Sequence, residues 1–334
     1  PIVWIAVMSF KSPIDAFSAS PWAVLTGPET RADGKGLSVL DIALGGAVLA
    51  AAVWLAFARL PRWVAAATPK GWIALGWLAG AALYAAGVVL VIFGILPPVL
   101  GLLNAIAGPL GEPVIGLTAE HYRSVWVENA FWRNFVNSMV ITGGTVTVSL
   151  TVGTLAGYAL ARSGAAIAFW ILIAALVFRA LPHSVLVAGY LPVFINSAEI
   201  LEPLLGPNAP TLYGQPLAVI AVLVSINQPF TIWMLRSFFQ SIPTELDEAA
   251  RVDGCTHFQA FRWVIMPVMW PGVITTGLFS FLLAYNDFLV CSLLLDAQNQ
   301  TMVPAIAGYF NRETTTTDQV EAVAAAVSIT APLF

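Results

Sequence analysis

The chain has 334 residues, of which 59% are hydrophobic and 10% are charged. Soluble domains carry roughly 25% charged residues, so this composition excludes an ordinary soluble protein and indicates a membrane protein. The net charge of −4 says little about partners, because charges on opposite sides of a bilayer do not act together. Both ends lie within apolar runs, so we expect incomplete first and last spans and no cleaved signal peptide.

Apolar stretches long enough to cross a hydrocarbon core recur along the chain. With both ends counted, about eight spans are predicted: residues 1–10, 37–57, 72–96, 135–160, 165–194, 217–234, 268–295 and from about 320. Pro97 and Pro98 are expected to stop the third span, and Pro182 and Pro192 to kink or break the fifth. Residues 97–130 are predicted to form an outer loop with an interfacial helix near 99–106, and residues 197–215 a second outer loop.

Basic residues favour one side of the membrane in this arrangement. That side receives Arg59, Arg62, Lys70, Arg162, Arg236, Arg251 and Arg262. The opposite side holds most of the acids together with Lys11, Arg31, Lys35, Arg123, Arg133 and Arg312. The second set weakens the bias without reversing it, so the loop at residues 59–70 and the segment at residues 241–271 are predicted to be cytoplasmic.

Residues 241–271 form a polar island between two long apolar segments. Thr244 is a good N-cap whose spacing to Asp247 is that of a capping box, and acidic residues crowd the following turn. Gly254 stands where a helix takes a left-handed residue to end. A short first helix is therefore expected, followed by a glycine turn.

A second capping box is expected at Thr256 and Gln259. It would open a helix that places Phe258, Phe261 and Ile265 on one face and ends at Pro267. The pattern predicts two short helices that form a knob facing water. Such a knob could also be a re-entrant amphipathic loop, whereas a DNA-binding helix-turn-helix is excluded because local acids outnumber the arginines.

The knob resembles the EAA motif of binding-protein-dependent ABC importer permeases. The match consists of Glu248-Ala249-Ala250, Gly254 and the run from Val264 to Pro267; Val264 and Met266 are conservative departures from the usual Ile-x-Leu-Pro. The resemblance implies an all-α polytopic membrane bundle of the type I importer kind, whose loop 241–267 docks on an ATP-hydrolysing subunit. It assigns ATPase coupling to these positions: Glu248, Ala249, Ala250, Asp253, Gly254 and Pro267.

From about His121 onward the chain is similar to permeases of carbohydrate importers of the maltose-system type. The resemblance is carried by the segments HYRSVWVENAFWRNFVNSMVIT, AGYALAR and LFSFLLAYNDFLV. Residues 27–117 depart from that family by inserting two spans, which suggests the alpha-glucoside subgroup. The chain is thus divided into residues 1–26 (end of a first span and outer loop), 27–117 (insertion) and 118–334 (core permease domain).

The resemblance also implies the partners. These are a dimer of ATP-binding cassette subunits that carries the ATP and Mg²⁺, a second permease subunit, an extracytoplasmic solute-binding protein and the lipid of the bacterial inner membrane. No cofactor is expected on this chain and no nucleic acid is expected as a partner. Cys255 and Cys291 fall in different segments, so no disulfide is expected.

Arg179 and Asp287 are the charges deepest within predicted spans, and such groups usually face a bundle interior or a water cavity. We predict that they approach one another along the solute path; alternatively they lock two helices together. Further candidates for the path are Asn227, Gln228, Tyr285 and Asn286, although polar contacts between helices explain such residues equally well. An intramembrane enzyme using Asp287, His183 or Arg179 is the alternative function, but no metal spacing, catalytic triad or glycine-rich phosphate loop supports it.

Overall fold

The computed structural model describes residues 2–59, 73–163, 166–179, 182–311 and 315–330. These residues are almost entirely helical, which confirms the all-α class. An antiparallel pair of short strands, β1 (Leu37–Ser38) and β2 (Pro113–Ile115), was not predicted from the sequence. Contacts divide the chain into two compact units, Pro1–Val125 with Glu313–Phe334 and Trp126–Arg312, which are described separately. The sequence-based boundaries near residues 27 and 118 stay predictions.

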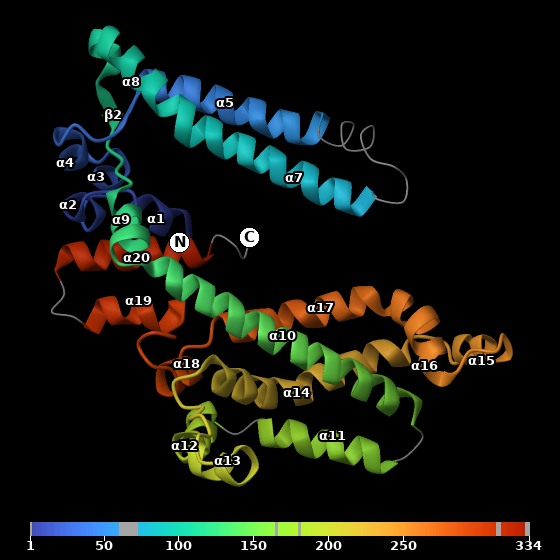
Figure 1. Cartoon of the computed structure of the whole chain (residues 1–334). Coiled ribbons are helices and arrows are strands. Elements are labelled where there is room, and N and C mark those ends of the chain that lie inside the picture. Colours follow the sequence, from blue (N-terminus) through green and yellow to red (C-terminus); the bar gives the residue numbers. More distant parts are fainter. Residues whose placement is uncertain (1, 60–72, 164–165, 180–181, 312–314, 331–334) are drawn as a thin grey trace. The chain divides into compact units, whose positions relative to one another are not determined.

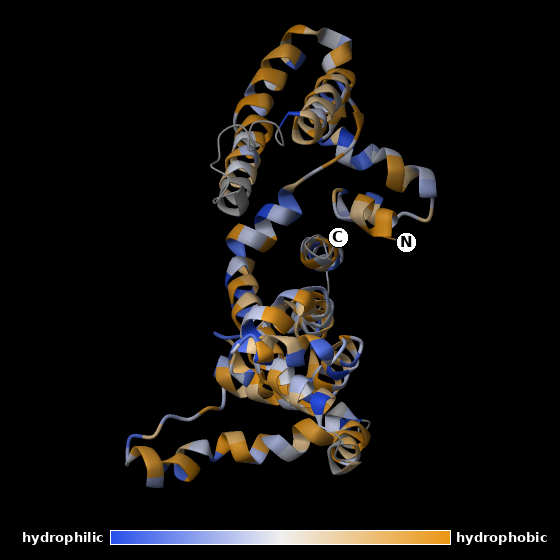
Figure 2. Cartoon of the chain, turned by 90° about the vertical axis from the view of Figure 1, so that its right-hand side faces the viewer, coloured by the Kyte–Doolittle hydropathy of each residue, from blue (hydrophilic) through white to orange (hydrophobic). Residues whose placement is uncertain are grey.

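Five helices among the described residues are long and apolar enough to cross a membrane. They are Val39–Ala58, Ala79–Ile106, Phe131–Arg162, Pro216–Gln240 and His257–Tyr285. A pair bent by 49°, Ser184–Ile195 and Ser197–Leu205, raises the number to six if it forms one span. The predicted total of about eight counted a partial span at each end of the sequence; the helices found there, α1 (Ile2–Met8) and α20 (Thr316–Thr330), are shorter than a full span. Hydrophobic residues dominate the long helices (Figure 2).

The first unit contains the inserted region as two long helices that lie side by side (Figure 1). They are α5 (Val39–Ala58) and a continuous helix made of α7 (Ile73–Val89), the π-helix η1 (Leu90–Ile95) and α8 (Leu96–Ile106). The Tyr84 hydroxyl donates to the carbonyl of Ala52. The Asn104 amide donates to both carboxylate oxygens of Asp41, over 3.0 and 3.1 Å. The tip between the helices, residues 60–72, lies outside the described residues.

Pro97 and Pro98 do not stop this helix, contrary to the sequence-based expectation. They lie in the first turn of α8, and η1 directly precedes them. In a π-helical turn the backbone hydrogen bonds span five residues instead of four. This shift of register removes the need for the N–H that proline lacks, so the helix continues. The stretch near residues 99–106 is therefore the end of this long helix rather than a separate interfacial helix.

Short elements complete the first unit. They are α1, α2 (Pro13–Ala16), α3 (Pro21–Thr26), α4 (Pro28–Ala32), the 3₁₀ turn η2 (Gly108–Gly111), α9 (Glu120–Arg123) and α20. Lys11 is fully buried among them, and its Nζ donates to the carbonyls of Leu25 at 2.9 Å and Gly116 at 2.5 Å. The Asp15 carboxylate accepts 2.7 Å hydrogen bonds from the backbone N–H and the hydroxyl of Thr30. Two charged groups thus order the loops that precede the inserted helices.

Three long helices form the centre of the second unit: α10 (Phe131–Arg162), α14 (Pro216–Gln240) and α17 (Met266–Tyr285). They lie side by side in Figure 1. The glycine-rich helix α10 packs closely where it meets α14. A Cβ at Gly153 would lie 2.7 Å from Cγ2 of Thr231, and one at Gly144 would lie 2.7 Å from Cδ1 of Ile220. A Cβ at either position would force the facing side chain to shift, so glycine allows this close approach.

Shorter helices surround these three. The predicted break in the span at residues 165–194 is confirmed at Pro182, the N-cap of α12 (His183–Ile195), which follows α11 (Ala166–Arg179). The second proline, Pro192, lies inside α12 and does not end it. The expected outer loop at residues 197–215 begins with α13 (Ser197–Leu205). The predicted span at residues 268–295 is wrong at its outer end: α17 stops at Tyr285, and α18 (Leu289–Leu294) follows a separate turn. The unit ends with α19 (Met302–Asn311).

Candidate functional site

The knob predicted from the sequence projects beyond the ends of α14 and α17 (Figure 1). Its first helix, α15 (Glu245–Val252), carries three acids in its first turn and Arg251 in its last. Gly254 follows with φ of 90°, a left-handed conformation that glycine adopts without strain. The hydroxyl of Thr256 and the side chain of Gln259 then form the expected capping box at the start of α16 (His257–Ala260).

The capping box expected at Thr244 and Asp247 is not formed. Thr244 has helical backbone angles and makes no side-chain cap; the N–H of Asp247 donates to the Thr244 carbonyl at 3.0 Å, and the Asp247 carboxylate is engaged elsewhere. Oδ2 of Asp247 accepts from Nε of Arg162 at 2.8 Å, and Oδ1 accepts from the Tyr158 hydroxyl at 2.5 Å. Both partners belong to the end of α10, more than 80 residues earlier in the sequence. A distant contact has replaced the local cap.

Arg162 joins three elements at this point. Besides its ion pair with Asp247, its Nη1 donates to the carbonyls of Phe239 at 3.3 Å and Ile242 at 3.2 Å, at the end of α14. These carbonyls stand at a helix C-terminus, where a cation is favoured. The pair is largely shielded, with side-chain exposures of 17% for Arg162 and 14% for Asp247. The sequence-based prediction gave Tyr158 and Arg162 no role in the knob. Their spacing of four, which places both on one helix face, was the available signal.

The second helix of the knob is not short and does not end at Pro267. The α16 segment, the π-helix η4 (Phe261–Ile265) and α17 run as one helix from His257 to Tyr285. Pro267 lies in the first turn of α17, directly after the π-helical turn, so its ring and its missing N–H are accommodated. The knob is therefore continuous with a membrane helix.

An apolar cluster supports the knob from below. Its buried members are Leu235, Phe239, Ile242, Phe261, Ile265, Met269 and Val273. The ring of Tyr158 packs against Phe261 and Phe239 at centroid distances of 4.8 and 5.4 Å. Phe258, expected on the same buried face as Phe261 and Ile265, is instead 62% exposed. Its ring still lies 6.3 Å from the ring of Phe261.

The residues assigned to ATPase coupling share an exposed surface, with one exception. Glu248, Ala249, Asp253, Gly254 and Pro267 are exposed, whereas Ala250 is 5% exposed and packs inward. No atom lies within 4 Å of the position that a Cβ at Gly254 would occupy. The small and acidic residues thus leave one face of α15 open to a partner.

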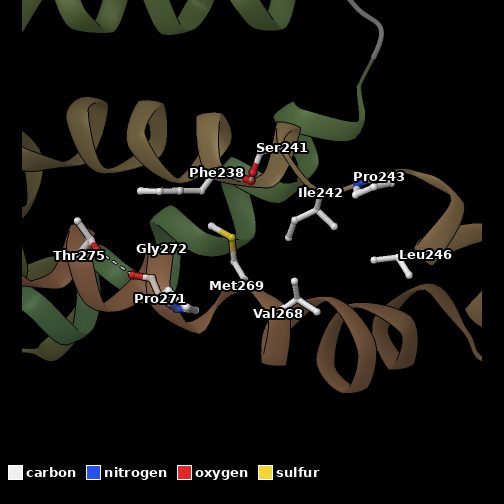
Figure 3. Close-up of a pocket in the computed structure, with 10 residues that line it drawn as sticks. All are labelled: Phe238, Ser241, Ile242, Pro243, Leu246, Val268, Met269, Pro271, Gly272 and Thr275. Atoms are coloured by element: carbon white, nitrogen blue, oxygen red, sulfur yellow. Dashed lines mark hydrogen bonds between the residues drawn. The ribbon is translucent and has the colours of Figure 1, made fainter.

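A groove of about 320 Å³ lies beside α15, along the side that carries Leu246 (Figure 3). Ile242 and Leu246 line one wall, and Val268 and Met269 line the other. α15 is therefore not packed against α17 over this side.

Arg179 and Asp287 do not form the predicted ion pair in the part of the chain that the structure describes. The Arg179 guanidinium lies 4.7 Å from the ring centroid of Phe230 on α14. The Asp287 carboxylate accepts a 2.8 Å hydrogen bond from the backbone N–H of Val290 and caps α18. The rotation of α11 about its axis, which the sequence does not specify, decides what Arg179 contacts.

The other path candidates occupy different environments. Asn227 is 1% exposed and donates to Oγ of Ser280 at 2.8 Å, which makes it a contact between α14 and α17. Gln228 donates to the Ser149 carbonyl at 3.4 Å. Tyr285 is buried and its ring stacks on Phe281 at 5.2 Å, whereas Asn286 is exposed. Asn286 alone of these four presents its side chain on the surface of this chain.

No group of three or more His, Cys, Asp or Glu side chains among the described residues could hold a metal ion. Cys255 in the knob and buried Cys291 are both free thiols.

Long apolar helices with a polar helical knob continuous with one of them define a polytopic membrane protein of the transporter class. A family model described as the binding-protein-dependent transport system inner membrane component matches residues 149–334. The chain belongs to this family. It is therefore a multi-pass permease of the bacterial inner membrane rather than an intramembrane enzyme.

Relatives within the family are named as uptake permeases. The diacetylchitobiose uptake system permease protein DasC of Streptomyces coelicolor is 32% identical over 187 residues, which cover 56% of this chain and 63% of DasC. The match thus spans a little under two thirds of that relative. The trehalose transport system permease protein SugB of Mycobacterium tuberculosis is 28% identical over 222 residues, covering 65% of this chain and 75% of SugB.

A solved structure supports the fold. The chain superposes on a bacterial ABC transporter involved in the import of the acidic polysaccharide alginate with a TM-score of 0.51 and 17% identity. The superposition covers 80% of this chain and 95% of the other. The bundle is that of type I ABC importer permeases.

Proposed function

We propose that the chain forms half of the translocation path of an ATP-driven sugar importer and couples that path to an ATPase dimer through the knob. The observation that carries the proposal is the open face of α15. Glu248 and Ala249 are exposed there, as is Gly254 just after the helix, while Asp247 on the same helix is held by Arg162 of α10. A small, acidic projection anchored at Asp247 suits insertion into a cleft of another protein.

The partners follow from this role. ATP and Mg²⁺ are bound by the ATPase dimer, a second permease subunit supplies the other half of the path, and an extracytoplasmic binding protein delivers the solute. ATP binding closes the dimer, draws the two knobs together and opens the path outward; hydrolysis resets it. The knob and the loop at residues 59–70 face the cytoplasm.

A sugar is the proposed solute because the relatives are named for sugars: diacetylchitobiose, trehalose and maltodextrin. Exposed Asn286 is proposed to line the path, with Arg179, Gln228 and Asp287 near it, while Asn227 and Tyr285 support the helices from within. The alpha-glucoside subgroup, suggested by the insertion at residues 27–117, stays a prediction. Uptake assays of the reconstituted importer with trehalose, maltodextrin and diacetylchitobiose test the solute class.

Variants of the knob test the coupling role in the assembled importer. Glu248→Lys is expected to abolish solute-stimulated ATPase activity, while Glu245→Lys, an equal change of charge in the same turn, retains it. Gly254→Pro is expected to abolish stimulation, while Gly254→Asn retains more of it because Asn tolerates positive φ. Normal stimulation by binding protein in Gly254→Pro and Glu248→Lys complexes would contradict the proposal.

A further inference from the structure

We propose that Asp247 is a positioning residue that joins the knob to α10. Movement of α15 then reaches α10 through this side-chain contact, in addition to passing along the backbone on either side of α15. The inference rests on the proposed function of the knob. It concerns the link from the knob into the bundle, and not the surface that faces the ATPase.

The first step of the argument is how few contacts hold α15. Within this fully described helix, the buried residue is Ala250. The groove lined by Leu246 and Val268 separates the other side from α17 (Figure 3). The strongest non-covalent attachment that remains is the Asp247 carboxylate, which uses one oxygen for Arg162 and the other for Tyr158.

The second step is the strength and direction of that attachment. Hydrogen bonds between ionised groups are shorter and stronger than those between neutral groups, and partial burial preserves their strength. Arg162 cannot move with α15 independently of α14, because its Nη1 also donates to two carbonyls at the end of α14. Its guanidinium therefore holds α15 and the end of α14 to the C-terminal turn of α10.

The third step is what α10 can pass on. Because Gly144 and Gly153 have no Cβ atom, α10 lies directly against α14 at these positions. The two helices cannot move apart there without losing contact. A displacement of the C-terminal turn of α10 is therefore transmitted to α14 along this interface. The groove beside Leu246 leaves α15 free space on one side, so Asp247 is the point at which movement of α15 reaches α10.

The test compares matched variants of the assembled importer in proteoliposomes. Asp247→Asn removes the charge at nearly constant shape, Arg162→Lys keeps the charge but loses the planar fork, and Glu245→Gln is the control in the same helical turn. Three quantities are measured: co-purification of the ATPase subunit, thermal unfolding temperature, and sugar molecules imported per ATP hydrolysed. The probe is the sugar of the three named above that the wild-type importer takes up.

We expect Asp247→Asn to assemble with the ATPase subunit and yet to import about fivefold less sugar per ATP, the lower end of usual coupling effects. Arg162→Lys should behave similarly, and the double variant should lose less than the two single losses combined. Asp247→Glu, which restores the charge, should recover part of the ratio. The control Glu245→Gln should match the wild type.

Two outcomes overturn the inference. One is a wild-type import ratio in Asp247→Asn. The other is a loss of assembly and thermal stability that fully accounts for lost transport, since this is what a merely structural contact would give. A wild-type importer that itself fails to link ATP hydrolysis to uptake would instead overturn the proposed function.

Discussion

Asn227 of α14 donates a hydrogen bond to Ser280 of α17 over 2.8 Å, and each residue is 1% exposed. Oγ1 of Thr231, one turn further along α14, lies 3.4 Å from the same Ser280 hydroxyl. Polar side chains buried between membrane helices are costly without partners, so this contact sets the register of α14 against α17.

Asn227→Ala should therefore destabilise the bundle. Hydrogen bonds between membrane helices contribute about 0.6 kcal/mol on average in double-mutant cycles. We expect a coupling free energy of that order between Asn227→Ala and Ser280→Ala, measured by unfolding in detergent. The control Ser237→Ala removes an exposed hydroxyl that bonds only within its own helix, to the Trp233 carbonyl, and should leave stability unchanged. Additive effects of the two single substitutions would contradict the assignment.

The α10–α14 interface should reject any side chain at Gly153. A methyl group there would meet Cγ2 of Thr231 at 2.7 Å, and overpacking of a tight core costs about 1–3 kcal/mol. Gly143→Ala is the matched control on the same helix, because nothing lies within 4 Å of its Cβ position. The thermal unfolding temperature of Gly153→Ala should thus lie well below those of Gly143→Ala and wild type. Equal unfolding temperatures for the two variants would show that the helices are less closely apposed.

The orientation of the knob can be tested with an impermeant thiol reagent. Val252 at the end of α15 is 87% exposed, and Leu204 on α13, in the predicted outer segment, is 82% exposed. In a background lacking Cys255 and Cys291, a cysteine replacing Val252 should react only after cells are lysed. A cysteine replacing Leu204 should react in intact cells. The reverse pattern would invert the proposed topology.

Low pH should destabilise the loops of the first unit, because it protonates the Asp15 carboxylate. Burial raises the pKa of its carboxyl, but hydrogen bonds from Thr30, Glu29 and Ser12 outweigh burial, so the pKa in the folded protein lies below its ordinary value of 3.8. A carboxyl with a lowered folded pKa stabilises the fold above the unfolded pKa, and this stabilisation disappears as the pH falls through the folded pKa.

Asp15→Asn should consequently unfold at a lower temperature than wild type at pH 7, and this difference should shrink as the pH is taken below about 3.8. Thermal unfolding of the detergent-solubilised protein at a series of pH values measures the difference. Asp33→Asn, at an exposed position two residues after Arg31, is the control. A difference between Asp15→Asn and wild type that stays constant from pH 7 to the acid range would contradict the prediction.

Local patterns in the sequence were sufficient where neighbouring residues decide the structure. The acidic turn of α15, the left-handed Gly254 and the capping box at Thr256 and Gln259 each involve residues within a few positions of one another. The apolar lengths of the main helices are also local, because a bilayer core sets how many residues a span needs. The membrane class, the glycine turn of the knob and the break near Pro182 followed from such patterns.

Other features depended on segments far apart in the chain. The Asp247 carboxylate, expected to complete a local capping box with Thr244, instead binds Arg162, 85 residues earlier. Arg179 contacts Phe230 rather than Asp287 because of the rotation of α11 about its axis, which one sequence does not determine. Pro97 and Pro267 do not end their helices because π-helical turns precede both. Propensity and periodicity describe a helix by itself, whereas tertiary packing decides which of its polar groups meet a partner and whether a proline is accommodated.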